Sequence, residues 1–98
     1  MKSQDMLTSE QRVRGSRVLQ ALAHPLRLGI MQALAESPQT CSELQALLGC
    51  PQPTLSLQLK VLVDQGLVAT CKEGTVKRCS IRNRDFLKLF PCLHRHLS

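Results

Sequence analysis

Aromatic residues are almost missing from this sequence, which has no tryptophan, no tyrosine and two phenylalanines among its 98 residues. Proteins that bind single-stranded nucleic acid stack successive bases on aromatic side chains, so this composition argues against that kind of partner. Apolar runs are short as well, and none approaches the roughly 18 residues that a membrane-spanning helix needs. We therefore expect neither a stacking surface for single strands nor a segment that crosses a membrane.

Catalytic sequence motifs are also missing. There is no phosphate-binding Walker loop, no nucleophile elbow, no glycine-rich dinucleotide loop and no candidate pair of catalytic carboxylates. Acidic residues are few, 7 Asp and Glu against 13 Lys and Arg, and a chain of this length has room for one modest core. We predict that the protein is not an enzyme and carries no cofactor.

Positive charge, in contrast, is abundant. The net charge is +6 and the pI is about 9.5, which favours a polyanionic partner. Without a stacking surface, double-stranded DNA fits this balance better than RNA or single strands. The basic residues gather in two clusters, an early one of Arg12, Arg14 and Arg17 and a late one of Lys72, Lys77, Arg78, Arg82, Arg84 and Lys88.

The cysteine count is odd, five in all, and no CxxC pair occurs. An odd number with no leading signal peptide argues against a secreted disulfide scaffold, and the spacings do not match a zinc site. We therefore expect reduced thiols in a cytoplasmic protein, several of them buried as small hydrophobic residues.

The middle of the chain predicts a helix-turn-helix. Thr40 and Glu43 have the spacing of a capping box for a helix that begins at Cys41, and Gly49 permits the left-handed conformation that ends such a helix. A second helix is expected to end near Gly66. Two short amphipathic helices joined by a tight turn form this motif. The core-facing stripe of the second helix is expected to be Leu55, Leu59 and Leu62.

The stretch LVATCKEGTVKRCSI predicts two strands and a β-hairpin with a turn at residues 73–74. That turn places Cys71 opposite Val76 and Val68 opposite Cys79, so the two cysteines are not expected to form a disulfide. A helix-turn-helix followed by a hairpin is a winged helix. The expected fold is mainly α with a small β-hairpin wing, about five helices and two strands.

Three further helices complete this prediction. The first is capped by Thr8 or Ser9, the second opens at Pro25, and the last is capped by Asn83. We expect one domain over residues 1–98. Its first seven residues are expected to be frayed.

Pro91 is expected to kink or end the last helix and to leave residues 91–98 as a short C-terminal tail. In the second helix Arg27 stands between two leucines. We expect it either to pair with an acid or a phosphate, or to lie on the surface with its stem packed.

Side chains that point away from the leucine stripe of the second motif helix are the candidates for DNA contact. The N-terminal end of such a helix usually reaches base edges, and glutamine can bond adenine in bidentate fashion. Basic residues of the hairpin are expected to bind phosphates, which positions the protein without reading sequence. The candidate DNA-binding residues are Gln52, Thr54, Ser56, Leu57, Gln58, Lys60, Lys72, Lys77 and Arg78.

ALAHPLRLGIMQAL, SELQALLGCPQPTLSLQLKVLVDQGLV and the basic hairpin together resemble the ArsR/SmtB family of bacterial winged-helix repressors. The resemblance runs from about Val18 to Phe90. It implies a homodimer joined through the first and last helices and bound to operator DNA. It further implies release by an inducer, often a metal or metalloid and sometimes an oxidant or a sulfide species.

The family's two standard metal sites are not matched. Thr40 and Ser42 stand where arsenic and cadmium sensors carry two cysteines, and Cys41 falls between them. Asp85 and the histidines of the last helix do not have the spacing of the zinc-sensing pattern. We therefore expect no metal site of either standard kind.

Any inducer is expected to act on cysteine thiols, with Cys41 and Cys92 as the candidate sensor. Cys41 opens a helix, whose partial positive charge lowers a thiol's pKa, and Cys92 lies in the expected tail. Together they could bind a thiophilic metalloid or form a disulfide. In the alternative, Cys50, Cys71 and Cys79 are packing residues and Cys41 is merely exposed.

Two alternatives to an inducible repressor stay open from the sequence. One is a winged-helix module that binds protein and not DNA, because a fold does not determine a function. The other is a DNA-binding regulator without an inducer site of its own. A small metal-binding or redox protein is disfavoured by the cysteine spacings. The basic wing and the polar tip of the second motif helix favour the repressor.

Overall fold

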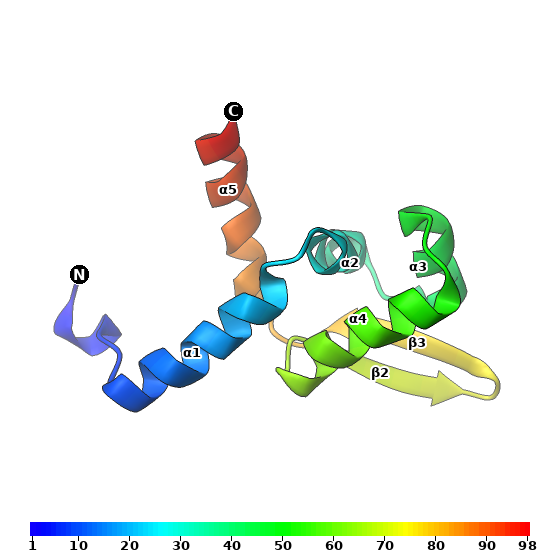
Figure 1. Cartoon of the computed structure of the whole chain (residues 1–98), viewed down its shortest axis with the longest axis horizontal. Helices are drawn as coiled ribbons and strands as arrows, with labels where there is room; N and C mark the ends of the chain where they lie inside the picture. Colours follow the sequence, from blue (N-terminus) through cyan, green and yellow to red (C-terminus); the bar gives the residue numbers. More distant parts are fainter.

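The computed structural model describes residues 1–98 and contains five α-helices and one three-stranded antiparallel sheet (Figure 1). A hairpin follows the helix-turn-helix, which confirms the predicted winged helix. The α-helices are α1 (Ser9–Leu22), α2 (Pro25–Glu36), α3 (Cys41–Leu48), α4 (Gln52–Asp64) and α5 (Leu89–Leu97). The strands are β1 (Gln39–Thr40), β2 (Val68–Glu73) and β3 (Val76–Ile81), and the 3-10 helices are η1 (Ser3–Asp5) and η2 (Arg84–Lys88).

Local capping residues set where the helices begin. Thr8 and Thr40 cap α1 and α3, and each hydroxyl accepts a hydrogen bond from the backbone N–H three residues on, at 3.1 Å. The imidazole of His24 accepts the N–H of the first turn of α2 at 3.1 Å, so this histidine is a helix cap. The predicted ends hold as well, because α3 ends at Gly49 with a φ of 61°.

The core is built mainly from leucines of α2, α3, α4 and the start of the hairpin. The predicted stripe of α4 is buried, with each of its three leucines at most 1% exposed. Burial of a side chain of this size stabilises the fold by about 1.5–3 kcal/mol. The buried residues are Ala21, Leu22, Ile30, Met31, Leu34, Leu44, Leu55, Leu59, Leu62, Leu67, Val68 and Cys79.

The hairpin register differs from the predicted one by two residues. Glu73 lies opposite Val76 and Cys71 opposite Arg78, because the loop is Gly74 and the residue after it. The first position of a two-residue hairpin loop needs a positive φ, and Gly74 supplies it at 66°. A turn at residues 73–74 would have forced glutamate into that conformation.

The sheet also contains a strand that the sequence did not predict. β3 is central, with β2 on one side and the two-residue β1 on the other. β1 pairs Gln39 with Cys79 and Thr40 with Arg78. This short strand joins the start of α3 to the hairpin, so the wing and the helix-turn-helix share one sheet.

The expected C-terminal tail is instead helical. α5 begins at Leu89, which makes Pro91 its third residue. Backbone N–H groups of a first turn have no partner inside the helix, so proline is tolerated there. Asn83 does act as a cap, but for η2, where its side chain accepts the N–H of Asp85 at 3.0 Å.

Two helices project from this body with apolar side chains uncovered. Figure 1 shows α1 and α5 leaving the core in different directions, with η1 and the N-terminus beyond the far end of α1 and the C-terminus at the end of α5. Val13 and Leu19 on α1 are each 54% exposed, and Leu97 on α5 is 78% exposed. Residues 1–7 are exposed throughout. No helix has the length and apolar character needed to cross a membrane.

Candidate nucleic-acid interface

The tip of α4 presents most of the predicted base-reading side chains to solvent. Gln52, Thr54 and Leu57 are exposed, and Ser56 is half-buried. The amide Nε2 of Gln52 donates to the hydroxyl of Ser56 at 2.7 Å, which orders the two side chains together. Further along the helix Lys60 is exposed and pairs with Asp64, Nζ to Oδ2 at 3.2 Å.

Gln58, another predicted DNA contact, is held from inside the protein. Its side-chain oxygen Oε1 accepts a hydrogen bond from Nη1 of Arg27 at 2.7 Å. Nε of the same arginine donates to the carbonyl of Ala21 at 2.6 Å. That carbonyl would normally accept the N–H four residues on, but the residue there is Pro25, which has none. Arg27 therefore makes no ion pair with an acid and does not lie as a simple surface residue; it links the end of α1 to α4.

The wing carries two lysines directly opposite each other. Lys72 pairs with Lys77 across β2 and β3, and both are exposed without an acidic partner. Arg78 is different, because its Nε lies 3.5 Å from Oε1 of Glu73 and its side chain is half-buried. Two like charges at opposite positions repel each other and together add to the positive potential of the wing. Among the predicted phosphate contacts of the hairpin, the two lysines are the ones without an acidic partner.

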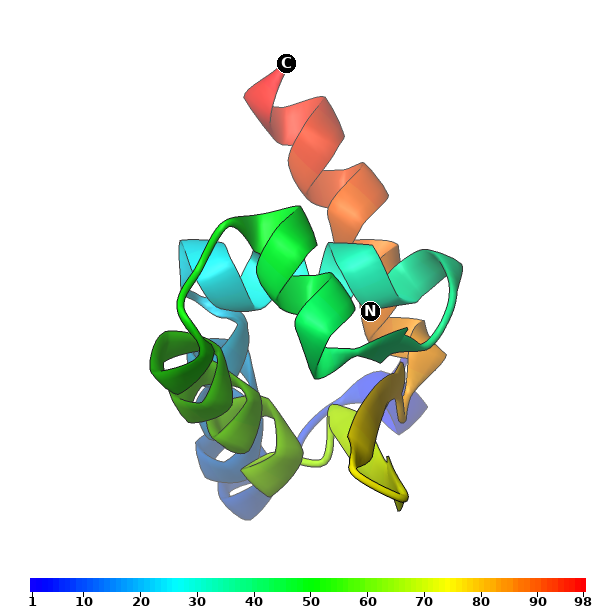
Figure 2. The same ribbon diagram turned by 90° about the vertical axis from the view of Figure 1, so that its right-hand side faces the viewer.

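A hollow of about 610 Å³ brings the tip of α4, the start of α3 and the wing together. Gln52 and Ser56 line it from α4, Lys77 from the wing and Cys41 from α3. Figure 2 looks onto this end of the molecule, where α3, the first turns of α4 and the hairpin tip are grouped. The candidate readers, a candidate phosphate contact and a candidate thiol therefore border the same space.

The five thiols are all free, and their placement differs from the expected pattern. Cys41 is half-buried beside Cys79, which is fully buried. Burial, with a smaller contribution from the neighbouring Cys41 thiol, raises the pKa of Cys79 to about 12, so it stays protonated. Cys92 lies exposed on α5, and Figure 1 shows α2 between that helix and α3. One chain therefore places Cys41 beside Cys79 and not beside Cys92.

Cys50 and Cys71 differ in burial. Cys50 is half-buried and packs against the core, as the alternative had it, whereas Cys71 is exposed, so the packing role that the alternative gave Cys71 is wrong. The closeness of Cys41 to Cys79 was missed because it depends on β1, which has no local sequence signal. No group of three or more His, Cys, Asp or Glu side chains lies together in a way that could hold a metal ion.

The sequence is similar to those of known helix-turn-helix proteins. Residues 22–71 match a family described as a helix-turn-helix domain. The chain is similar to the biofilm growth-associated repressor of Agrobacterium fabrum, 46% identical over 57 residues that cover 58% of this chain and 49% of the relative. It is also similar to the probable mercury resistance operon repressor of Streptomyces lividans, 35% identical over 81 residues, 80% of this chain and 65% of the relative. The chain thus spans about half to two thirds of the length of these relatives.

Solved structures show the same architecture over nearly the whole chain. The transcriptional repressor BigR from Xylella fastidiosa superposes with a TM-score of 0.85 and 28% identity, over 100% of this chain and 98% of that one. The homodimeric winged helix-turn-helix domain Mb0332 from Mycobacterium bovis, described as a possible ArsR-family regulator, gives a TM-score of 0.78 and 26% identity. That match covers 95% of this chain and 89% of the other.

Proposed function

The chain belongs to the ArsR/SmtB family of winged helix-turn-helix regulators, and from this premise we propose that it is a sequence-specific repressor of transcription that binds double-stranded operator DNA. The single observation that carries the proposal is the hollow shared by α4, α3 and the wing. It puts the polar side chains of Gln52 and Ser56 and the unpaired Lys77 on one face of a protein with a net charge of +6. The relatives named as repressors support the same reading.

The side chains divide into readers and positioning groups. Thr54 and Leu57 are exposed without a side-chain partner, and the exposed Gln52 is oriented by its hydrogen bond to Ser56, so these three side chains are the ones that meet base edges. A good bidentate contact discriminates bases by about 1–3 kcal/mol. Lys72 and Lys77 bind phosphates of the backbone. Ser56, Gln58 and Arg78 have internal partners, and Lys60 pairs with Asp64 on the exposed side of α4. These residues act chiefly by holding the helix and wing in place.

The active form is a homodimer in the cytoplasm joined through α1 and α5. Both helices expose apolar side chains that one chain does not cover. Small domains gain stability when such surface is buried against a second copy. The Mycobacterium bovis domain, whose fold this chain shares, is itself described as homodimeric. Twofold symmetry would place two α4 helices about 34 Å apart, one turn of DNA.

Release from DNA is proposed to follow chemistry at thiols, with Cys41 as the primary group. Cys41 borders the hollow with Gln52 and Lys77, so a metalloid or an oxidised sulfur on it would occupy space beside the DNA-facing side chains. Cys92 is exposed and could supply a second sulfur ligand. Because α5 and α3 are apart in one chain, Cys92 would act from the partner chain or after a movement of α5.

Binding of duplex DNA is tested with the region upstream of the protein's own gene, by fluorescence anisotropy over a range of salt concentrations. Lys77→Ala should weaken binding to all sequences and lower the salt slope by roughly 0.9, the value for one phosphate contact. Gln52→Ala should instead reduce discrimination between operator and unrelated duplex. Lys2→Ala, at an exposed lysine ahead of α1, serves as the charge-matched control. Absence of salt-dependent DNA binding would favour the protein-interaction module instead.

The thiol proposal has its own experiment. Arsenite, a persulfide and peroxide are each added to the operator complex of the wild type, Cys41→Ser, Cys92→Ser and Cys71→Ser. Loss of the response in Cys41→Ser, with Cys71→Ser behaving like wild type, is the expected result. A response that survives in both Cys41→Ser and Cys92→Ser would leave a regulator without a thiol sensor at these positions.

A further inference from the structure

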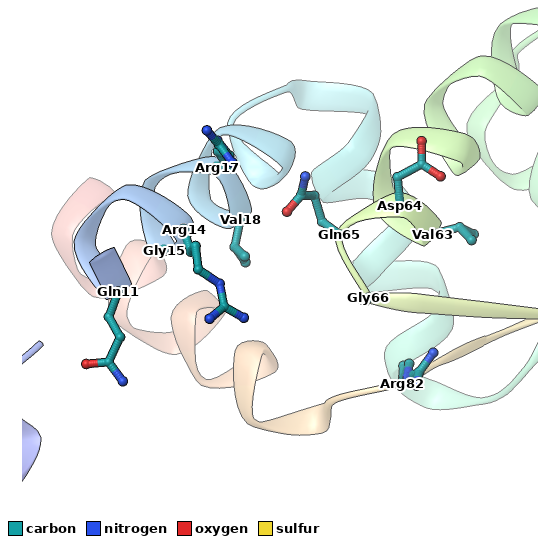
Figure 3. A pocket seen from close by; sticks show the side chains of 10 residues that line it. All are labelled: Gln11, Arg14, Gly15, Arg17, Val18, Val63, Asp64, Gln65, Gly66 and Arg82. Atoms are coloured by element: carbon teal, nitrogen blue, oxygen red, sulfur yellow. The ribbon is translucent and has the colours of Figure 1, made fainter. Parts of the chain in front are cut away.

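A second basic site lies at the opposite end of α4 from the base-reading tip. A hollow of about 730 Å³ opens between α1, the last turn of α4 and the residue that follows β3. Arg14 and Arg17 line it from α1, and Arg82 lines it from the end of β3. Figure 3 shows Arg14 extending from α1 toward this space, with Arg82 on the far side and Gln65 pointing from the end of α4 toward α1.

The three arginines of this hollow have no partners within the protein. No side-chain hydrogen bond or ion pair engages Arg14, Arg17 or Arg82, whereas Arg12, Arg27 and Arg84 all donate to protein oxygens. The single acidic side chain at the rim is Asp64. Since Asp64 already pairs with Lys60 at 3.2 Å, the hollow keeps a clear excess of positive charge.

The last carbonyl groups of α4 are engaged in hydrogen bonds, so they repel an anion less than the free carbonyl groups of an uncapped helix would. The N–H of Gly66 donates to the carbonyl of Val63 and the N–H of Leu67 to the carbonyl of Leu62, each at 3.0 Å. This is the Schellman arrangement, and Gly66 makes it with a φ of 73°. The side-chain amide of Gln65 has no partner and adds a hydrogen-bond donor to the rim.

We propose that this hollow binds a small phosphorylated molecule through its phosphate group. Guanidinium groups match phosphate because their planar N–H donors form paired, charge-assisted hydrogen bonds. Val18 and Val63 also line the hollow and offer apolar surface to the organic part of such a molecule. The 13 residues of α4 separate this site by about 20 Å from the tip that faces DNA.

A phosphate held here would join α1 to the end of α4. α1 is one of the two helices assigned to the dimer, and its other face borders a separate apolar hollow with Ser16 and Leu19. The ligand would thus restrict how the dimer helix and the DNA-reading helix move relative to each other. This regulatory consequence rests on the proposed function, whereas the binding itself does not.

Binding is tested on the free protein, without DNA, by calorimetric titration with inorganic phosphate at constant ionic strength in chloride. We expect the double variant Arg14→Gln, Arg82→Gln to lose at least tenfold in phosphate affinity. Asp64→Asn should tighten binding several-fold, because it removes the only negative side chain at the rim. The double variant Lys2→Gln, Lys88→Gln removes two charges at exposed positions outside the hollow and should match the wild type. No phosphate binding by the wild type, or an equal loss in this control, would overturn the proposal.

A DNA phosphate has the same chemistry, and a second measurement separates the two sources. In phosphate-free buffer the double variant should bind operator with the salt slope of the wild type, because the site is not on the DNA-facing end. A slope lowered by one or two contacts would assign the hollow to the DNA backbone and refute a small-molecule site. Failure of all DNA binding would refute the proposed function and leave the phosphate titration as it stands.

Discussion

Removal of the Arg27 guanidinium should destabilise the protein far more than loss of an ordinary surface arginine. The variant Arg27→Met keeps the aliphatic stem but deletes the donors to Gln58 and to the carbonyl of Ala21. A hydrogen bond to a charged group contributes about 1.5–3 kcal/mol, and an orphaned carbonyl costs about 1–3 kcal/mol. Because Arg27 is only half-buried, we expect a net loss near 2–3 kcal/mol in the free energy of unfolding.

Urea denaturation followed by circular dichroism at one protein concentration measures this loss, and the melting temperature should fall by roughly 10–20 °C. Arg84→Met is the matched control, since Arg84 donates a single hydrogen bond, to the carbonyl of Ala35 at 2.7 Å, from an exposed position. Arg27→Lys keeps the charge but not the several N–H donors of the planar guanidinium, so it should recover only part of the loss. A double-mutant cycle with Gln58→Ala should give a coupling of about 1 kcal/mol. If Arg27→Met costs no more than Arg84→Met, the linking role is refuted.

Three other predictions concern the turn, a helix cap and a buried thiol. Gly74→Ala should destabilise the wing by about 1–2 kcal/mol, because alanine must adopt a φ of 66°, and urea titration detects it. The hydrogen bonds from Thr40 hold the pKa of Glu43 below its ordinary 4.5. The carboxylate therefore stabilises the folded state above pH 4.5, and this stabilisation is lost as pH falls through the lowered pKa. The free energies of unfolding of the wild type and Glu43→Gln should converge at low pH. The raised pKa of Cys79 predicts the opposite direction, with stability falling as pH rises above about 9, a slope that Cys79→Ala should remove. In native alkylation Cys71 and Cys92 should react well before Cys79, and equal rates would contradict its burial.

Features that depend on a few neighbouring residues were predictable from the sequence. The Thr40 capping box, the end of α3 at Gly49 and the buried stripe of α4 rest on spacings within one or two helical turns. The hairpin was also expected, but its register was wrong because the loop was assigned one residue too early. A requirement for positive φ at the first loop position would have selected Gly74 over Glu73.

Features that depend on distant parts of the chain were not predictable. β1 is only two residues long and exists because β3 offers it a partner some forty residues away in sequence. The closeness of Cys41 to Cys79 follows from that pairing. Arg27 and Gln58 are 31 positions apart, although the missing N–H of Pro25 shows, once the end of α1 is known, that a donor is needed. Whether Pro91 ends a helix or lies in its first turn depends on where α5 begins, and α5 begins at Leu89 because η2 occupies the residues before it.

The opposed lysines of the wing make the hairpin locally less stable near its turn than at its base. Lys72 and Lys77 repel each other at exposed positions near the turn, while the other end of the hairpin is anchored by the buried Val68. Local opening should therefore begin at the turn and spread inward, and amide hydrogens there should exchange with solvent earlier than those beside Val68. In the DNA complex proposed above, a phosphate between the two lysines would offset their repulsion, and the wing would gain order on binding. The affinity for DNA would then include relief of a repulsion that the unbound chain carries.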